Sequence, residues 1–303
     1  MAMVGNPPQT SRTSATAGAE GNTGALALED LGALTFDGPD SAAFLQGYLT
    51  IDLDALGGEP AFTAMCNIKG RTVLTGYAWR EDERVTIIVH RSLCALALSF
   101  LAPYLAFSKT RASDATAHCT LIGAMGLNLP APARDLDAER QIMLLPGEGV
   151  NEAERLLAAG PTLTTNDWRH AAIARREVWL ETATSGFFLP QMLALDELGA
   201  VSFAKGCYLG QEVVARAQHR GEVKRKLTTL AWTEDQPHVG AELRGANGHA
   251  AGVVVATAAK SANERTALAV MGRHAIEPFT IKGSASTLRT SALSREQAGL
   301  GAN

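Results

Sequence analysis

β-Branched and aromatic side chains occupy every second position from Val73 to Trp79, namely Val73, Thr75, Tyr77 and Trp79. A repeat of two residues places these side chains on one face of a β-strand. The polar residues 81–84 then separate this stretch from the apolar run Val85–Val89. Because two strands joined by a short polar turn form a hairpin, the pattern predicts a β-hairpin that ends near Val89.

Other stretches have the spacing of three and four residues that is typical of a helix facing a core. Apolar residues recur at this spacing from Leu93 toward Pro103, and Ser92 before them is a favourable N-cap residue. Residues 151–160 begin with an asparagine and acidic residues and end in Gly-Pro, which predicts a complete short helix. Two further helices are predicted after the Asp37–Asp40 turn and after Asp167 as a cap.

Beyond Lys226 the pattern changes to short apolar runs that glycine, asparagine and proline separate. These runs are Leu227–Trp232, Ala251–Ala256 and Thr266–Met271. Short strands with turn residues between them are typical of a small β-barrel. The chain is therefore predicted to be an α+β protein with a C-terminal β domain.

The same pattern predicts the domain boundaries. We expect an α+β core over residues 25–226, made of two subdomains (roughly 25–116 and 117–226), and a β domain over 227–288. The two ends, residues 1–24 and 289–303, contain few large apolar side chains. Segments of this kind bury too little surface to offset their ordering entropy, so we expect both ends to be disordered.

Composition narrows the class of protein. The chain has 303 residues, 46% of them hydrophobic, and a net charge of −4, which argues against a globally basic nucleic-acid binder. Its four cysteines lie far apart without a CxxC pair, which excludes a self-contained zinc or four-cysteine iron–sulfur site. No run approaches 18 apolar residues and no secretory signal pattern begins the chain, so we expect a cytoplasmic protein with free thiols and no membrane partner.

One segment, Lys205-Gly206-Cys207-Tyr208-Leu209-Gly210-Gln211-Glu212, places a cysteine between two glycines and after a lysine. A nearby ammonium group favours a thiolate, and so does a helix N-terminus if Gln211 begins a helix. Cys207 is then a reactive or coordinating thiol, or it is a small buried hydrophobic residue, as free cysteines usually are. Local chemistry alone favours the buried residue, because no partner base is identified.

This segment, with the Val-Ala-Arg that ends at Arg216, resembles the signature of the folate-binding YgfZ family. That family belongs to the superfamily of glycine-cleavage T-proteins, which are aminomethyltransferases. Further segments resemble the family in the expected order over about residues 28–275, namely Phe-Leu-Gln-Gly at 44–47, Asn-Ile-Lys-Gly-Arg at 67–71, Phe-Ser-Lys at 107–109 and Leu-Pro-Gln at 189–191. Several ordered motifs are a more specific signal than a single glycine pattern.

The resemblance implies a T-protein-like fold whose two α+β subdomains and β-barrel surround a central opening for tetrahydrofolate. It also implies an accessory protein for the assembly or repair of iron–sulfur clusters in client enzymes, including a tRNA-modifying one. A single cysteine supplies one ligand, so such a cluster would be transient and shared with a partner. The implied functional residues are Cys207, Lys205, Gln211 and Glu212 around the thiol, with Trp168, Lys69, Arg71, Gln191, Tyr208 and Arg216 as folate contacts.

Three positions depart from the T-protein pattern. Residues 66–71 contain no carboxylate where T-proteins carry an aspartate that helps to transfer a one-carbon unit. Ala174 stands near the place of a folate-contacting glutamate, and Ala194 stands where an asparagine often follows Pro-Gln. These departures favour a non-enzymatic role over the alternative, a folate-dependent one-carbon transferase.

Two assignments and one charged segment stay open. Trp168 stacks on a pterin or anchors its helix, and Lys69 and Arg71 pair with a folate carboxylate or decorate a hairpin. Residues 216–226 are strongly basic and could bind RNA, an acidic partner or the glutamate tail of folate. We favour a solvated turn there, because no aromatic residues interleave with Arg216, His219, Arg220, Lys224, Arg225 and Lys226.

Overall fold

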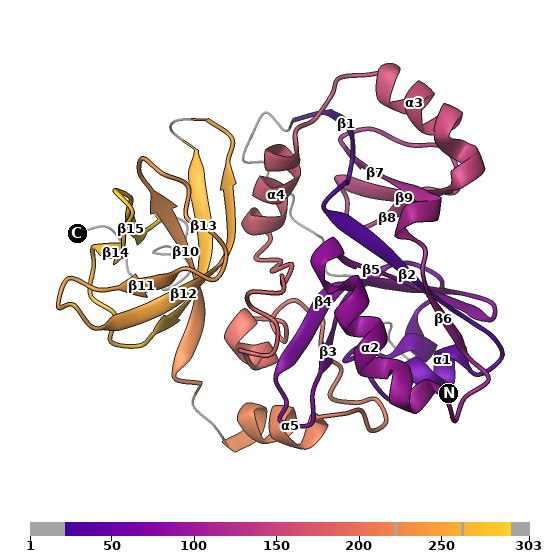
Figure 1. Ribbon diagram of the computed structural model, residues 1–303, viewed down its shortest axis with the longest axis horizontal. Coiled ribbons are helices and arrows are strands. Elements are labelled where there is room, and N and C mark those ends of the chain that lie inside the picture. The colour runs from indigo at the N-terminus through magenta and orange to yellow at the C-terminus, as the bar shows by residue number, and fades with distance from the viewer. Residues whose placement is uncertain (1–21, 221–222, 262–263, 292–303) are drawn as a thin grey trace, which may run out of the picture.

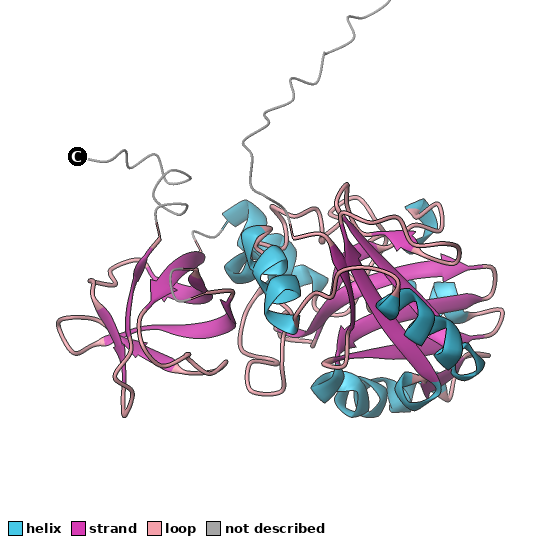
Figure 2. Ribbon diagram, turned by 90° about the horizontal axis from the view of Figure 1, so that it is seen from above, coloured by secondary structure: helices cyan, strands magenta, loops and turns pink. Residues whose placement is uncertain are grey.

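The computed structural model describes residues 22–220, 223–261 and 264–291. Two antiparallel sheets lie on one side of the molecule, and a closed barrel lies on the other (Figure 1). Helix α4 (Thr165–Ala174) stands between them and packs against the barrel strand β12 (Ala250–Ala259). The view from above shows the same division, with helices between the barrel and the sheets (Figure 2). This is the α+β architecture with a C-terminal barrel that the sequence predicts.

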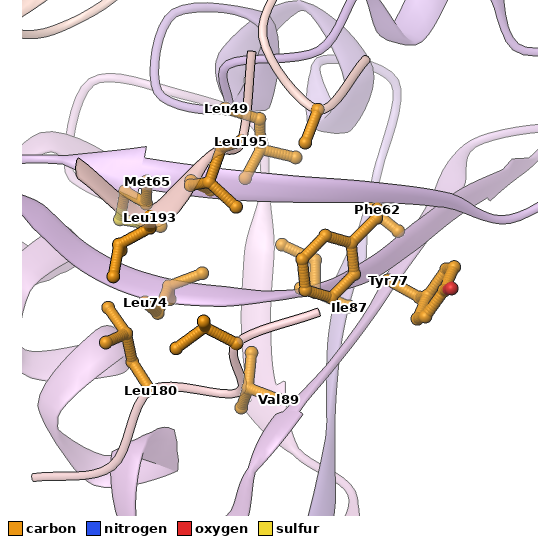
Figure 3. Close-up of a cluster of buried hydrophobic side chains, with 14 of the residues drawn as sticks. Leu49, Phe62, Met65, Leu74, Tyr77, Ile87, Val89, Leu180, Leu193 and Leu195 are labelled. Atoms are coloured by element: carbon orange, nitrogen blue, oxygen red, sulfur yellow. The ribbon is translucent and has the colours of Figure 1, made fainter. Parts of the chain in front are cut away.

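The first sheet has five strands in the order β3-β4-β5-β2-β6, with helices α1 (Ser41–Gln46) and α2 (Cys94–Leu105) beside it. Its strands are β2 (Leu31–Asp37), β3 (Ala61–Cys66), β4 (Thr72–Glu81), β5 (Arg84–His90) and β6 (Arg111–Asp114). Strands β4 and β5 form the predicted hairpin. The sheet contributes to a large apolar core in which Leu49, Phe62, Met65, Leu74, Tyr77, Ile87, Val89, Leu180, Leu193 and Leu195 gather (Figure 3).

The second sheet has the order β1-β7-β9-β8 and packs against α3 (Val150–Ala158). Its strands are β1 (Gly24–Ala27), β7 (Cys119–Met125), β8 (Arg134–Asp135) and β9 (Arg140–Pro146). The division predicted near residue 116 needs a correction, because β1 pairs with β7 in the second sheet. Such a long-range pairing leaves no mark on the local hydrophobic pattern, which shows only that a strand forms.

Six strands close the C-terminal barrel in the order β10-β13-β12-β11-β14-β15. They are β10 (Arg225–Trp232), β11 (Glu242–Arg244), β12, β13 (Arg265–Gly272), β14 (Phe279–Ile281) and β15 (Thr287–Thr290). The three predicted apolar runs lie in β10, β12 and β13. The barrel encloses its own core, which includes Leu230, Trp232, Leu243, Val254, Phe279 and Leu288.

The predicted helices form, but their caps differ. Ser92 is not the cap of α2, because a short 3-10 turn precedes that helix. The backbone N–H of Ser92 donates a hydrogen bond to Nδ1 of His90, which caps this turn. Helix α3 begins one residue before its predicted cap. At α4 the cap is Thr164, and Asp167 completes a capping box with it from the third helical position. Neighbouring polar residues compete for a cap, and the sequence pattern alone does not rank them.

Both predicted tails extend too far into the fold. Gly24 already pairs with Met125 in β1, and Thr287–Thr290 pairs with β10 and β14. Backbone hydrogen bonds build these strands, so their ordering needs no large apolar side chain. The other residues of the predicted tails, 1–21 and 292–303, lie outside the described part of the chain.

Candidate functional site

The loop that carries Cys207 packs on the turn between β3 and β4. Two glycines with positive φ make the contact, Gly70 (φ 67°) in the turn and Gly210 (φ 84°) in the loop. A Cβ atom on Gly210 would lie 2.4 Å from the carbonyl oxygen of Asn67, and one on Gly70 would lie 2.8 Å from the Val213 side chain. Two motifs far apart in the sequence therefore form one site through contacts that require glycine.

Lys205 fixes this loop to the segment that follows α1. Its side chain is buried, and Nζ donates hydrogen bonds to the carbonyl oxygens of Gln46 (2.8 Å), Leu49 (2.7 Å) and Ile51 (2.6 Å). Burial lowers the pKa of Lys205 to about 8, although two nearby aspartates oppose the shift. Because the three ammonium N–H groups already have acceptors, the structure gives Lys205 a positioning role, and none of its donors is left for Cys207.

Cys207 is the accessible thiol among the four cysteines. Its side chain is exposed, whereas Cys66 and Cys94 are buried and Cys119 is half-buried. Burial raises the pKa of Cys66 to about 12 and that of Cys119 to about 11, and it also raises the pKa of Cys94. The interpretation of Cys207 as a small buried residue is therefore wrong, and a partner molecule can reach this thiol.

Tyr208 and Gln211 hold the loop at the start of α5 (Gln211–Arg220). The backbone N–H of Tyr208 donates to Oε1 of Gln211 (3.3 Å), and its ring lies 5.5 Å from Nζ of Lys205. The Tyr208 hydroxyl is buried without a hydrogen-bond partner, and burial raises its pKa. Both residues thus stabilise the loop conformation, and Tyr208 also retains an unused donor.

The remaining motif residues lie on or near α5. Glu212 and Arg216 are exposed and form an ion pair one helical turn apart. Gln191 lies in the 3-10 turn Pro190–Leu193, and its Nε2 donates to the carbonyl oxygen of Val214 (2.8 Å). Gln191 therefore fastens α5 to the core, while its own Oε1 is buried without a partner.

Lys69 and Arg71 lie in the turn under the Cys207 loop. The Lys69 side chain is exposed, and Nη1 of Arg71 donates to the carbonyl oxygen of Phe187 (3.0 Å). Both residues thus decorate the β3–β4 hairpin, at the same site as the thiol.

A separate cavity lies between α4, the first sheet and the barrel. Trp168 and Trp179 line it, and its other lining residues include Glu177, Asp30, His90, Arg169 and Glu181. The indole Nε1 atoms of both tryptophans are buried and have no hydrogen-bond partner. Unpaired buried donors beside an apolar cavity indicate a place for a ligand with acceptor groups. Trp168 is the predicted folate contact that lines this cavity; the others lie at the Cys207 loop, the β3–β4 turn, the 3-10 turn Pro190–Leu193 and α5.

Glu177 is a cavity residue that the sequence analysis missed. Nη1 of Arg140 donates to its Oε2 (2.9 Å), and the hydroxyl of Tyr77 donates to its Oε1 (2.7 Å). Burial alone would lower the pKa of Arg140, but the Glu177 carboxylate outweighs burial and raises it. The chain turns at Arg176 (φ 61°) just after α4, so the wall of the cavity receives a carboxylate although Ala174 has none. The sequence feature that could have identified Glu177 is an isolated acidic residue before an apolar stretch.

Three further observations limit what kind of site the described residues can form. Among the described residues, no three histidine, cysteine or acidic side chains gather as a metal site. No helix in the described part of the chain is long and apolar enough to span a bilayer. The basic segment predicted from the sequence is exposed at Arg216, His219, Lys224, Arg225 and Lys226. The side chain of Arg220 is not among those that the structure describes.

A comparison with models of protein families finds no match. Among curated proteins, the chain is 32% identical over 297 residues to the tRNA-modifying protein YgfZ of Klebsiella pneumoniae (strain 342), which covers 87% of this chain and 90% of that protein. It is 33% identical over 264 residues to the protein of the same name from Pectobacterium carotovorum subsp. carotovorum (strain PC1), covering 76% and 78% of the two chains.

Among solved structures, the chain resembles the glycine cleavage system aminomethyltransferase T from Bartonella henselae. The TM-score is 0.69 at 14% identity, over 90% of this chain and 86% of the other. This likeness shows the T-protein fold alone, and the curated relatives add sequence identity over most of their length. The chain therefore belongs to the family of the proteins named tRNA-modifying protein YgfZ.

Proposed function

We propose that this protein is a tetrahydrofolate-binding accessory protein that supports assembly or repair of iron–sulfur clusters in client enzymes, including tRNA-modifying ones. The observation that carries the proposal is the exposed Cys207 on a loop that Lys205 and Gly210 fix in place. An accessible thiol on a fixed loop suits contact with a cluster, a sulfur species or a client protein. Because Cys207 supplies one ligand, such a cluster is transient and shared with the partner.

The cavity at α4 has a donor set that fits a reduced folate. Trp168 and Trp179 line the cavity and carry unpaired N–H donors. The carboxylate oxygens of Glu177 already accept hydrogen bonds from Arg140 and Tyr77, so Glu177 shapes the wall of the cavity. The two tryptophans would hold the pterin, and the folate would supply its capacity to carry a one-carbon unit.

The folate half of the proposal is tested by anaerobic titration with tetrahydrofolate, followed by tryptophan fluorescence and calorimetry. We expect saturable binding, and we expect Trp168→Phe and Trp179→Phe each to weaken it about fivefold or more, because each removes a donor. Trp232→Phe in the barrel core is the matched control and leaves the affinity unchanged. No saturable binding up to millimolar tetrahydrofolate would contradict the proposal.

A second candidate is a folate-dependent one-carbon transferase, which the T-protein fold favours. It requires an acid or base near the reacting atoms. The β3–β4 turn has no carboxylate, and Arg140 and Tyr77 already hold Glu177. Turnover of an aminomethyl or methyl donor with tetrahydrofolate, abolished by Glu177→Gln, would support the transferase. We expect no such turnover.

A further inference from the structure

Three consecutive cations, Lys224, Arg225 and Lys226, stand where the chain enters β10. Their side chains are exposed, and no carboxylate of a described residue lies within ion-pair distance (4.0 Å) of them. Some exposed cations elsewhere have a carboxylate partner, as Arg84 has in Asp37 (2.5 Å). Like charges repel one another, and among the described residues no carboxylate offsets that repulsion by pairing with them, so we expect these cations to attract an anion.

Neighbouring elements extend this cationic surface. Figure 1 shows α5 at the bottom of the molecule, below the sheets. The backbone N–H of Arg273 donates to the carbonyl oxygen of Lys224 (3.2 Å), so the exposed residues Arg273 and His274 lie beside the cations. On α5, a shallow depression is lined by Glu212, Ala215, Arg216 and His219.

Phe203 adds an aromatic ring to the same surface. It is 39% exposed although it is large and apolar. Its ring centroid lies 6.4 Å from that of the exposed His219, in an edge-on arrangement. The two residues come from different segments, so the basic run seemed to lack aromatic neighbours in the sequence. The half-exposed Phe203 ring, held edge-on against His219, offers a face on which an unstacked base can pack.

We propose that the α5–β10 surface, defined as Phe203, Arg216, His219, Lys224, Arg225 and Lys226, binds RNA directly. The cations contact backbone phosphates, and an unpaired base stacks on the Phe203–His219 pair. Phosphates next to a stacking base fit this combination better than the surface of an acidic protein, which uses charges without an aromatic platform. This binding depends neither on folate nor on a cluster.

The test uses fluorescence anisotropy of an end-labelled, transcribed tRNA with the full chain. Four phosphate contacts give a slope of about −3 to −4 in log K against log salt, so affinity falls about 50- to 150-fold between 50 and 200 mM salt. In the triple variant Lys224→Gln, Arg225→Gln, Lys226→Gln, one contact remains, and affinity falls about threefold over that range. Phe203→Ala weakens binding about fivefold or more at an unchanged slope, because it removes stacking and no charge.

Matched controls separate this surface from net charge and from exposed rings in general. The triple variant Lys109→Gln, Arg111→Gln, Arg155→Gln removes the same charge from exposed positions on other elements, and Phe107→Ala removes another exposed ring. Both controls bind tRNA like the unmodified chain. The proposal is overturned if tRNA shows no saturable binding at 50 mM salt, which leaves the surface to an acidic protein. It is also overturned if the two triple variants weaken binding equally.

Discussion

Replacement of Lys205 by methionine gives the sharpest test of how the Cys207 loop is held. Methionine keeps the length of the side chain but removes the ammonium group. The carbonyl oxygens of Gln46, Leu49 and Ile51 then lose their shared donor. A buried polar group left without a partner costs about 1–3 kcal/mol, and the packing of the new side chain offsets part of that sum. We expect the free energy of unfolding to fall by about 3–5 kcal/mol.

Urea denaturation measures this loss from the shift in midpoint at constant slope. Lys69→Met is the matched control, because Lys69 is exposed in the adjoining turn, and we expect a change within about 0.5 kcal/mol. A stability loss under 1 kcal/mol would refute the positioning role of Lys205.

Three other predictions follow from the same contacts. Gly210→Ala should destabilise the protein by about 2 kcal/mol or more in urea, because its Cβ would meet Asn67, whereas Gly206→Ala has open space and should change little. Brief alkylation of the native protein should modify Cys207 first by mass spectrometry; rapid labelling of a buried cysteine would contradict the structure. Burial lowers the pKa of His90, although the nearby carboxylates of Glu181 and Asp30 oppose the shift. The unfolded chain therefore binds the proton more readily than the folded one, and the free energy of unfolding falls as the pH drops below about 6.5. His90→Gln should flatten that acid dependence in thermal melts, and an unchanged dependence would refute it.

Local patterns were sufficient for much of the fold. The β4–β5 hairpin and the barrel strands β10, β12 and β13 are visible in the sequence because alternation and turn residues act over a few positions. The pairing of β1 with β7 is not visible, since it depends on a match between segments far apart in the chain. Helix caps were displaced for a related reason, as at Thr164 and Asp167, where two adjacent candidates share one capping box.

The candidate site shows the same limit. The motif around Cys207 marks the right loop, but its chemistry depends on backbone carbonyls that Lys205 meets only in the fold. Trp179 gave no signal as a ligand contact and Glu177 only a weak one, because the turn at Arg176 is what brings them to the cavity. Spacing in the sequence identifies residues with chemistry, whereas their partners come from tertiary contacts.

The most direct measurement of the central claim is complementation by Cys207→Ala in a strain that lacks the protein. The readout is the activity of a cluster-dependent tRNA-modifying enzyme, with Cys119→Ala as the control for loss of a half-buried thiol. The account predicts that both variants fold and accumulate normally, that Cys119→Ala restores activity, and that Cys207→Ala fails to do so. Full restoration by Cys207→Ala would contradict the claim that this thiol carries the function.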